Sequence, residues 1–179
     1  MMKDLAIKGV YDSVIEAYDN SSTFSFSNAP WFLDGNYTFT KGRFDVIDDF
    51  VISGSGYTFS YQSQGISKIY DKGGNMIIDE GVVFSYEPVT ANNNLIQLTA
   101  PAAQLTLRGS TLRSATIGLQ LTMGTLLVDR TSNLINDSFV LGQEINFGDG
   151  LNSSNNLTIE ILPAATLNVL SGCVTTNDV

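Results

Sequence analysis

Residues 98–128 read LTAPAAQLTLRGSTLRSATIGLQLTMGTLLV, and leucine returns in them at every seventh position. Extended in both directions, the seven-residue step runs from position 77 to position 168 and meets an apolar residue at eleven of fourteen positions. A chain with 43% apolar residues would give about six by chance. The apolar members are Ile77, Phe84, Ala91, Leu98, Leu105, Leu112, Leu119, Leu126, Val140, Phe147 and Ile161.

A seven-residue apolar repeat is also typical of a coiled coil, in which a second apolar residue follows three or four positions later. Here the second apolar residue follows two positions later, as in Leu105 with Leu107 or Leu119 with Leu121. Such alternation is the pattern of strands with one buried face. The spacing therefore predicts short strands, with a turn of the chain every seven residues.

Three such strands make a coil of 21 residues, which is a common size for stacked structural repeats. Strands stacked in this way are parallel, and the preferred hand of their crossovers makes the coil right-handed. The sequence thus predicts an all-β, right-handed parallel β-helix with three sides. The residues expected to point inward are Leu98, Leu105, Leu119, Leu126, Val140, Phe147 and Ile161.

One domain is expected over residues 1–179. Residues 9–18 place Val10, Tyr11 and Val14 at helical spacing, which predicts a short amphipathic cap helix, although Gly9 disfavours it. The expected parts are a cap or first coil at 1–30, aromatic-rich early coils at 31–74, regular coils at 75–170 and a tail at 171–179.

The period leaves one similarity unexplained. The segment Gly74-Asn-Met-Ile-Ile-Asp79 resembles Gly124-Thr-Leu-Leu-Val-Asp129, but their offset of 50 residues is not a multiple of 21. The register of the coils before residue 75 therefore stays open at the level of sequence.

The leucine ladder, the segment Gly124–Asp129 and the sequence Ala164-Ala-Thr-Leu-Asn-Val-Leu-Ser-Gly172 resemble right-handed parallel β-helix proteins. That group includes pectate-lyase-like enzymes, phage tailspikes and autotransporter passenger domains, and Leu-rich coils with Asn and Gly turns resemble the passenger domains most. The resemblance covers residues 75–170, concerns architecture and transfers no functional residue. It implies a cell-surface or extracellular protein, although the start of the chain shows no signal peptide.

The composition argues against several classes of function. The net charge is −9 and none of the nine Lys and Arg lies beyond Arg130, so the chain lacks the basic surface that binds nucleic acid. No apolar run approaches the roughly 20 residues of a membrane span, so membrane insertion is not expected. Histidine is absent and Cys173 is the single cysteine, so neither a cofactor nor an intrachain disulfide is expected.

Asp45, Asp48 and Asp49 form the densest acidic cluster. Polysaccharide-cleaving enzymes use carboxylates as calcium ligands or as an acid–base pair, so these residues are candidates for a binding site. In an extended segment, however, Asp48 and Asp49 point to opposite faces, which favours a solvated coil edge. Trp31 is expected to pack the first coils rather than to stack on a sugar ring.

Asn146, Asp149 and Asn152 lie on a Gly-rich segment and are candidate calcium ligands, because oxygen donors suit that ion. The glycine–aspartate pattern of calcium-binding β-rolls does not repeat around them, which argues for no metal. Asp79 and Asp129 each end an apolar strand, where a structural hydrogen bond to the turn backbone is expected.

Two functions stay open. The first is a non-catalytic structural or adhesive module whose Thr-, Ser- and Asn-rich flanks contact glycans or surface proteins. The second is a polysaccharide lyase or hydrolase of the pectate-lyase-like type, with Arg108 and Arg113 as basic candidates in the regular coils. The missing His and the short turns favour the first, so no catalytic residue is assigned.

The C-terminal coil is expected to lack a cap. After Leu170 only nine residues remain, and they carry no amphipathic pattern. An uncovered coil exposes unpaired backbone groups and the apolar side chains inside it. End-to-end self-association through this coil is therefore expected.

Overall fold

The computed structural model describes residues 24–26, 31–39, 44–46, 48–61, 69–71, 73–86, 96–98, 100–114, 119–137, 145–148, 157–171 and 174–176. The regular structure in these ranges is β-strand, and every strand pairing within them is parallel. None of these residues belongs to a helix long and apolar enough to cross a membrane. The predicted cap helix at residues 9–18 lies outside the described residues.

The strands form four sheets, and within each sheet a strand pairs with the strand three places further along the chain. Sheet A contains β1 (Phe24–Phe26), β4 (Phe44–Val46), β7 (Ile69–Asp71) and β10 (Ile96–Leu98). Sheet B contains β2 (Trp31–Phe32), β5 (Phe50–Ser53), β8 (Asn75–Ile78), β11 (Gln104–Arg108), β14 (Gly124–Arg130) and β17 (Leu157–Ile161). Sheet C contains β3 (Tyr37–Phe39), β6 (Thr58–Tyr61), β9 (Val83–Tyr86), β12 (Thr111–Ser114), β15 (Ser132–Asn136) and β18 (Leu167–Ser171). Sheet D contains β13 (Leu119–Leu121), β16 (Ile145–Phe147) and β19 (Val174–Thr176).

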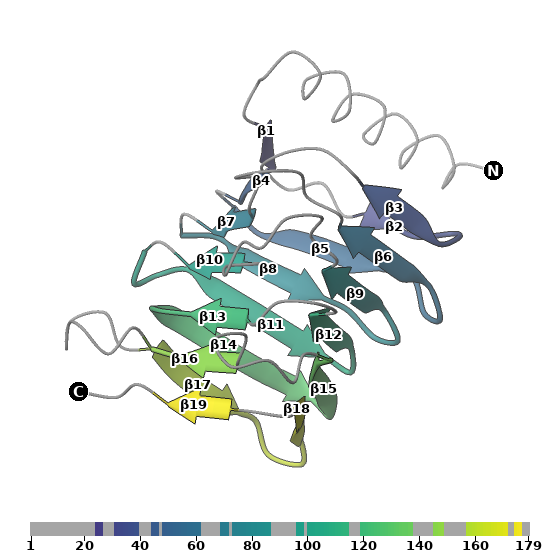
Figure 1. The fold of residues 1–179 in the computed structure, drawn as a ribbon. Coiled ribbons are helices and arrows are strands. Elements are labelled where there is room, and N and C mark those ends of the chain that lie inside the picture. The colour runs from purple at the N-terminus through teal and green to yellow at the C-terminus, as the bar shows by residue number, and fades with distance from the viewer. Residues whose placement is uncertain are drawn as a thin grey trace.

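We call one passage of the chain through sheet A or D, then B, then C a pass. The passes stack from β1 at one end of the molecule to β19 at the other (Figure 1). Strand β13 contacts β10, so sheet D continues the side that sheet A begins. The result is an all-β stack with two parallel sheets of six strands, which is compatible with a β-solenoid-like repeat.

The passes differ in length, so the expected constant period of 21 residues is wrong. Paired residues are 21 apart for Gln104 and Thr125, but 20 apart for Phe24 and Phe44 and 35 apart for Ser132 and Leu167. From Leu98 to Asn133 the seven-residue step marks the successive strands β10 to β15, whereas some other connections between strands are longer. Residues at a spacing of 21 are therefore not always stacked on one another.

The variable period explains the offset of 50 between the two similar glycine segments. Asn75 pairs with Gln104, which pairs in turn with Thr125, so the segments lie two passes apart. Gly124 begins its segment at φ +80°, and a Cβ there would lie 2.4 Å from the carbonyl oxygen of Ala103. A Cβ at Gly74 would lie 2.4 Å from the carbonyl oxygen of Asp48. Both positions require glycine because the chain of the preceding pass runs against them.

The interior of the stack changes from aromatic to aliphatic along its length. The ring of Trp31 lies 5.0 Å from that of Phe50 and 5.3 Å from that of Phe59, so the structure places this tryptophan in the core. Phe59 stacks on Phe84, its in-register neighbour in the next pass, at 5.4 Å. Later passes fill the interior with Leu105, Leu107, Leu112, Leu126 and Leu134.

Most of the described side chains expected to point inward do so. Leu98, Leu105, Leu126 and Phe147 are buried. Ile161 is 48% exposed, so its expected burial is wrong: it lies in β17, the end strand of sheet B. The side chain of Leu119 and the whole of Val140 lie outside the described part of the chain.

Candidate functional site

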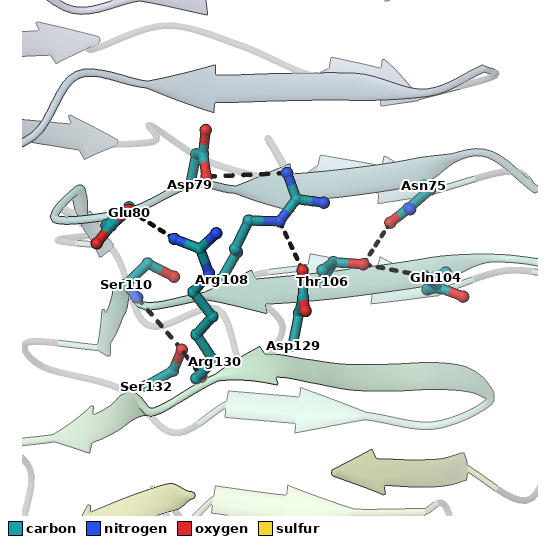
Figure 2. Close-up of polar contacts among 10 residues, drawn as sticks. All are labelled: Asn75, Asp79, Glu80, Gln104, Thr106, Arg108, Ser110, Asp129, Arg130 and Ser132. Atoms are coloured by element: carbon teal, nitrogen blue, oxygen red, sulfur yellow. Dashed lines mark hydrogen bonds and ion pairs between the residues drawn. The ribbon is translucent and has the colours of Figure 1, made fainter. Parts of the chain in front are cut away.

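Charged side chains of the described residues gather where sheet B turns into sheet C. We call Asp79, Glu80, Arg108, Asp129 and Arg130 the corner network (Figure 2). They come from the ends of β8, β11 and β14, three strands that lie side by side in sheet B. The network therefore spans three passes.

Each arginine of the corner network bonds to a carboxylate of another pass. Arg108 lies between two aspartates: its Nε donates to Asp129 Oδ2 at 2.7 Å, and its Nη1 lies 3.9 Å from Asp79 Oδ1 (Figure 2). Arg130 Nη1 donates to Glu80 Oε2 at 2.7 Å, across the intervening pass. All five side chains are partly exposed, so solvent weakens each ion pair.

A β-bulge explains how two adjacent residues of β14 both join the network. Leu107 pairs with Val128, but Arg108 pairs with Arg130, so Asp129 is the extra residue of the bulged strand. A bulge re-aims the side chains around it. It therefore allows both Asp129 and Arg130 to reach the passes before their own.

A second polar group lies on the outer face of sheet B, next to the corner network. Thr106 is 1% exposed; its hydroxyl donates to Asn75 Oδ1 at 2.7 Å and accepts from Gln104 Nε2 at 2.9 Å (Figure 2). Thr125 continues the row, because it is in register with Gln104. Hydrogen bonds hold Asn75, Gln104 and Thr106 of this amide and hydroxyl row in place.

The outer face of sheet C carries similar contacts between passes. Arg113 Nε donates to Asp137 Oδ2 at 2.7 Å. Asn133 Nδ2 donates to Thr111 Oγ1 at 3.2 Å, and Asn168 Nδ2 donates to Asn133 Oδ1 at 3.1 Å. Within the described residues, all the basic side chains therefore bond to a carboxylate of a different pass.

This chemistry differs from that of a polysaccharide-cleaving site. Glycoside hydrolysis uses a protonated carboxyl group and an ionised one about 5–10 Å apart across the substrate. In the corner network all three carboxylates, those of Asp79, Glu80 and Asp129, face a guanidinium. The arrangement balances charge between passes and joins them.

The structure describes the acidic cluster only in part. Asp48 and Asp49 are exposed between β4 and β5, which fits a solvated edge. Asp45 lies in β4 in register with Tyr70, and its side chain lies outside the described part. No three of the described His, Cys, Asp and Glu residues lie close enough together to hold a metal ion.

The calcium candidates fall mostly beyond the described ranges. Asn146 lies in β16 in register with Gln120, while Asp149 and Asn152 are not among the described residues. The expectation that these positions hold no metal therefore stays a prediction. Cys173 also lies outside the described residues.

Sequence analysis identified two members of the corner network, but not their contacts. Asp79 and Asp129 were expected to hydrogen-bond their own turns, and the structure places both carboxylates beside Arg108 instead. Glu80 and Arg130 went unnoticed, because 50 residues separate them and their contact depends on the true register. These charged residues share a position at the end of an apolar strand or directly after it, and this shared position could have identified them in the sequence.

A search of protein families, of curated proteins and of solved structures finds no match to this chain.

Proposed function

We propose that the chain is a right-handed parallel β-helix that serves as a non-catalytic structural or adhesive module, on a cell surface or secreted, and contacts glycans or proteins. The return of the chain to the same sheet at every third strand supports the β-helix. The right hand follows from the strong preference for right-handed crossovers between parallel strands.

The ion pairs that the described arginines form support a structural role. Arg108, Arg113 and Arg130 each bond to a carboxylate of another pass at 2.7 Å. A polysaccharide lyase needs basic groups that face its substrate, and here these groups face other passes. This is the observation that carries the proposal.

The row of Asn75, Gln104, Thr106 and Thr125 is the surface that best suits a glycan. Amides and hydroxyls exchange hydrogen bonds with sugar hydroxyls, and residues already fixed by packing lose little entropy on binding. The buried hydroxyl of Thr106 positions both amides. A rigid stack would present these groups to a glycan at regular intervals, set by the distance between paired strands.

The proposal is tested by measuring binding and turnover together. The full chain is incubated with polygalacturonate and a panel of oligosaccharides, with and without calcium. We expect retention of some glycans without cleavage. Gln104→Ala combined with Thr125→Ala should weaken that retention, whereas Thr38→Ala, an exposed change in sheet C, should leave it unchanged.

Two results would overturn the proposal. Cleavage of a polysaccharide that disappears on replacing Asp45 or Asp49 by Ala would instead establish the lyase or hydrolase. Retention that is indifferent to the double change in sheet B would place glycan contact elsewhere.

A further inference from the structure

Asp34 and Gly35, which we call the turn pair, lie between β2 and β3 in the first pass. The side chain of Asp34 is exposed. Among the described aspartates it is the one that a glycine follows, and each of the others precedes a residue with a side chain. This difference matters chemically, because glycine has no Cβ that would hinder a reaction of its backbone nitrogen.

The backbone at Gly35 has open space beside it. A Cβ built on Gly35 would meet no atom within 4 Å, and the φ of this residue lies outside the left-handed region. By contrast, a Cβ at Gly54 would lie 2.5 Å from the carbonyl oxygen of Leu33, and one at Gly124 would lie 2.4 Å from that of Ala103. A change in the backbone angles of Gly35 therefore meets no close neighbour on that side.

The residues on either side of the turn pair are anchored to the second pass. The backbone N–H of Leu33 donates to the carbonyl oxygen of Ser53 at 2.7 Å. The side-chain Oδ1 of Asn36 accepts from the backbone N–H of Thr58 at 2.9 Å. The turn pair is therefore a bridge between two fixed points, and it is open to water at Asp34.

The carboxyl group of Asp34 is held beside its own turn. The hydroxyl of Tyr37 donates to Asp34 Oδ1. Because Tyr37 begins β3, this contact keeps the carboxyl group on the side of the residues that follow it in the chain. Those residues include Gly35, whose backbone nitrogen is the nucleophile that can reach the carboxyl carbon of Asp34.

We propose that Asp34 is a modification site, at which the turn pair closes to a succinimide and reopens as isoaspartate. The backbone nitrogen of Gly35 forms a bond to Cγ of the protonated Asp34 carboxyl group. The bond from Cγ to its hydroxyl oxygen breaks, and the hydroxyl leaves with the amide proton as water. The proposal rests on exposure and chain geometry and does not depend on glycan binding.

Hydrolysis of the ring completes the change. Water adds to the main-chain carbonyl carbon of Asp34, and the bond from that carbon to the nitrogen of Gly35 breaks. The main chain then runs through Cγ, and the former main-chain carbonyl becomes the free carboxylate. The water taken up balances the water released, so the reaction needs no oxidant, reductant or other co-reactant.

Isoaspartate adds a methylene group to the main chain of the turn. The added length falls between Leu33 and Asn36, whose bonds to the second pass are set for the shorter turn. The carboxylate also leaves its place beside Tyr37. We therefore expect isomerisation to loosen β2 and β3 and to leave the later passes unchanged.

Peptide mapping by mass spectrometry tests the proposal on the full folded chain, incubated for weeks in neutral buffer. The peptide that contains Asp34 should accumulate a form lighter by one water. It should then accumulate an isomer of unchanged mass that resists a protease cutting before aspartate. The peptide that contains Asp48 and Asp49 is the internal control, because both are exposed but precede residues with side chains, and it should stay unchanged.

Two variants test the chemistry and the turn separately. Gly35→Ala should slow the conversion several-fold, because a Cβ hinders the attacking nitrogen, and it should fold because that Cβ meets no close neighbour. Asp34→Asn closes the same ring with loss of ammonia instead of water. It should convert faster and appear as a gain in mass after hydrolysis, in the folded chain as well as in guanidinium.

Four outcomes would overturn the proposal. The first is a peptide containing Asp34 that stays unchanged in the folded chain. The second is equal conversion in the peptide that contains Asp48 and Asp49. The third is a rate in Gly35→Ala equal to that of the unaltered chain. The fourth is conversion of Asp34→Asn in guanidinium only, since the folded turn would then forbid ring closure.

Discussion

In sheets B and C, the strands of the fifth and sixth passes have a similar alternating pattern of apolar residues and differ in whether both edges are paired. In sheet B, β14 has β11 on one side and β17 on the other, whereas β17 has a described neighbour only in β14. Leu126 in β14 is fully buried, and Ile159, its partner in register, is 42% exposed. The alternating pattern of a strand therefore sets which side chains can face inward, and the neighbouring pass decides whether they are buried.

The largest expected effect is the difference in the free energy of unfolding between variants at Leu126 and at Ile159. Leu126→Ala removes a buried side chain between two occupied passes and should lower the free energy of unfolding by about 3 kcal/mol. Ile159→Ala removes a side chain already half in water and should cost less than about 1 kcal/mol. Urea unfolding at low protein concentration measures both. Equal costs would show that the last pass is packed like the fifth.

The next largest effect on stability is expected at Gly124, where the backbones of two passes approach closely. Gly124→Ala combines a φ of +80° with a Cβ 2.4 Å from the carbonyl oxygen of Ala103, so it should cost about 3 kcal/mol. Gly109→Ala is the matched change, because its φ is +65° but the atom nearest to the new Cβ, Cγ of Glu80, lies 3.6 Å away. It should cost about 1 kcal/mol in thermal or urea unfolding. If the two variants lose the same stability, the contact between passes at Gly124 is looser than described.

The turn of the last pass offers a stabilising change. Three turns from sheet B to sheet C have glycine at positive φ, at Gly56, Gly81 and Gly109, whereas the turn of the last pass has Ala164 at φ 68°. Ala164→Gly should therefore raise the free energy of unfolding by about 0.5 kcal/mol. Ala165→Gly, at a neighbouring residue without positive φ, should lower it by a similar amount. A loss of stability in Ala164→Gly would contradict the turn geometry.

The corner network should have the smallest effect. Replacing Arg108 by Gln or Asp129 by Asn should each cost about 0.5 kcal/mol at low salt, because the pair is partly exposed. The double variant should show coupling that fades at high salt. Glu160→Gln, an exposed change in β17, serves as the control and should leave stability nearly unchanged. Coupling that is independent of salt would indicate a contact shielded from solvent.

The sequence predicted the strands better than the way they stack. Leu105, Leu112 and Leu126 each mark a strand, because the interior face of every strand needs an apolar residue. The period of 21 failed because connections between strands carry no apolar signal that fixes their length. The offset of 50 between the glycine segments is the sum of two unequal passes, which became visible only from the pairing.

The contacts of the corner network could not be predicted either, because they also depend on the register of the strands. The strand-ending carboxylates Asp79 and Asp129 were recognisable, but their partner Arg108 follows from register. In the last strand of sheet C, Val169 is 37% exposed although its partner in register, Leu134, is buried. The burial of Ile161 was wrongly expected because periodicity does not show which strand is last in a sheet.

Amide hydrogen exchange of β14 and β17 tests the central claim most directly, because it measures the two neighbouring strands in one experiment. At low protein concentration the account predicts strong protection of the amides around Leu126 and weak protection of those around Ile159. Equal protection of both strands would contradict the account, since it would mean that the last pass is covered as well as the fifth.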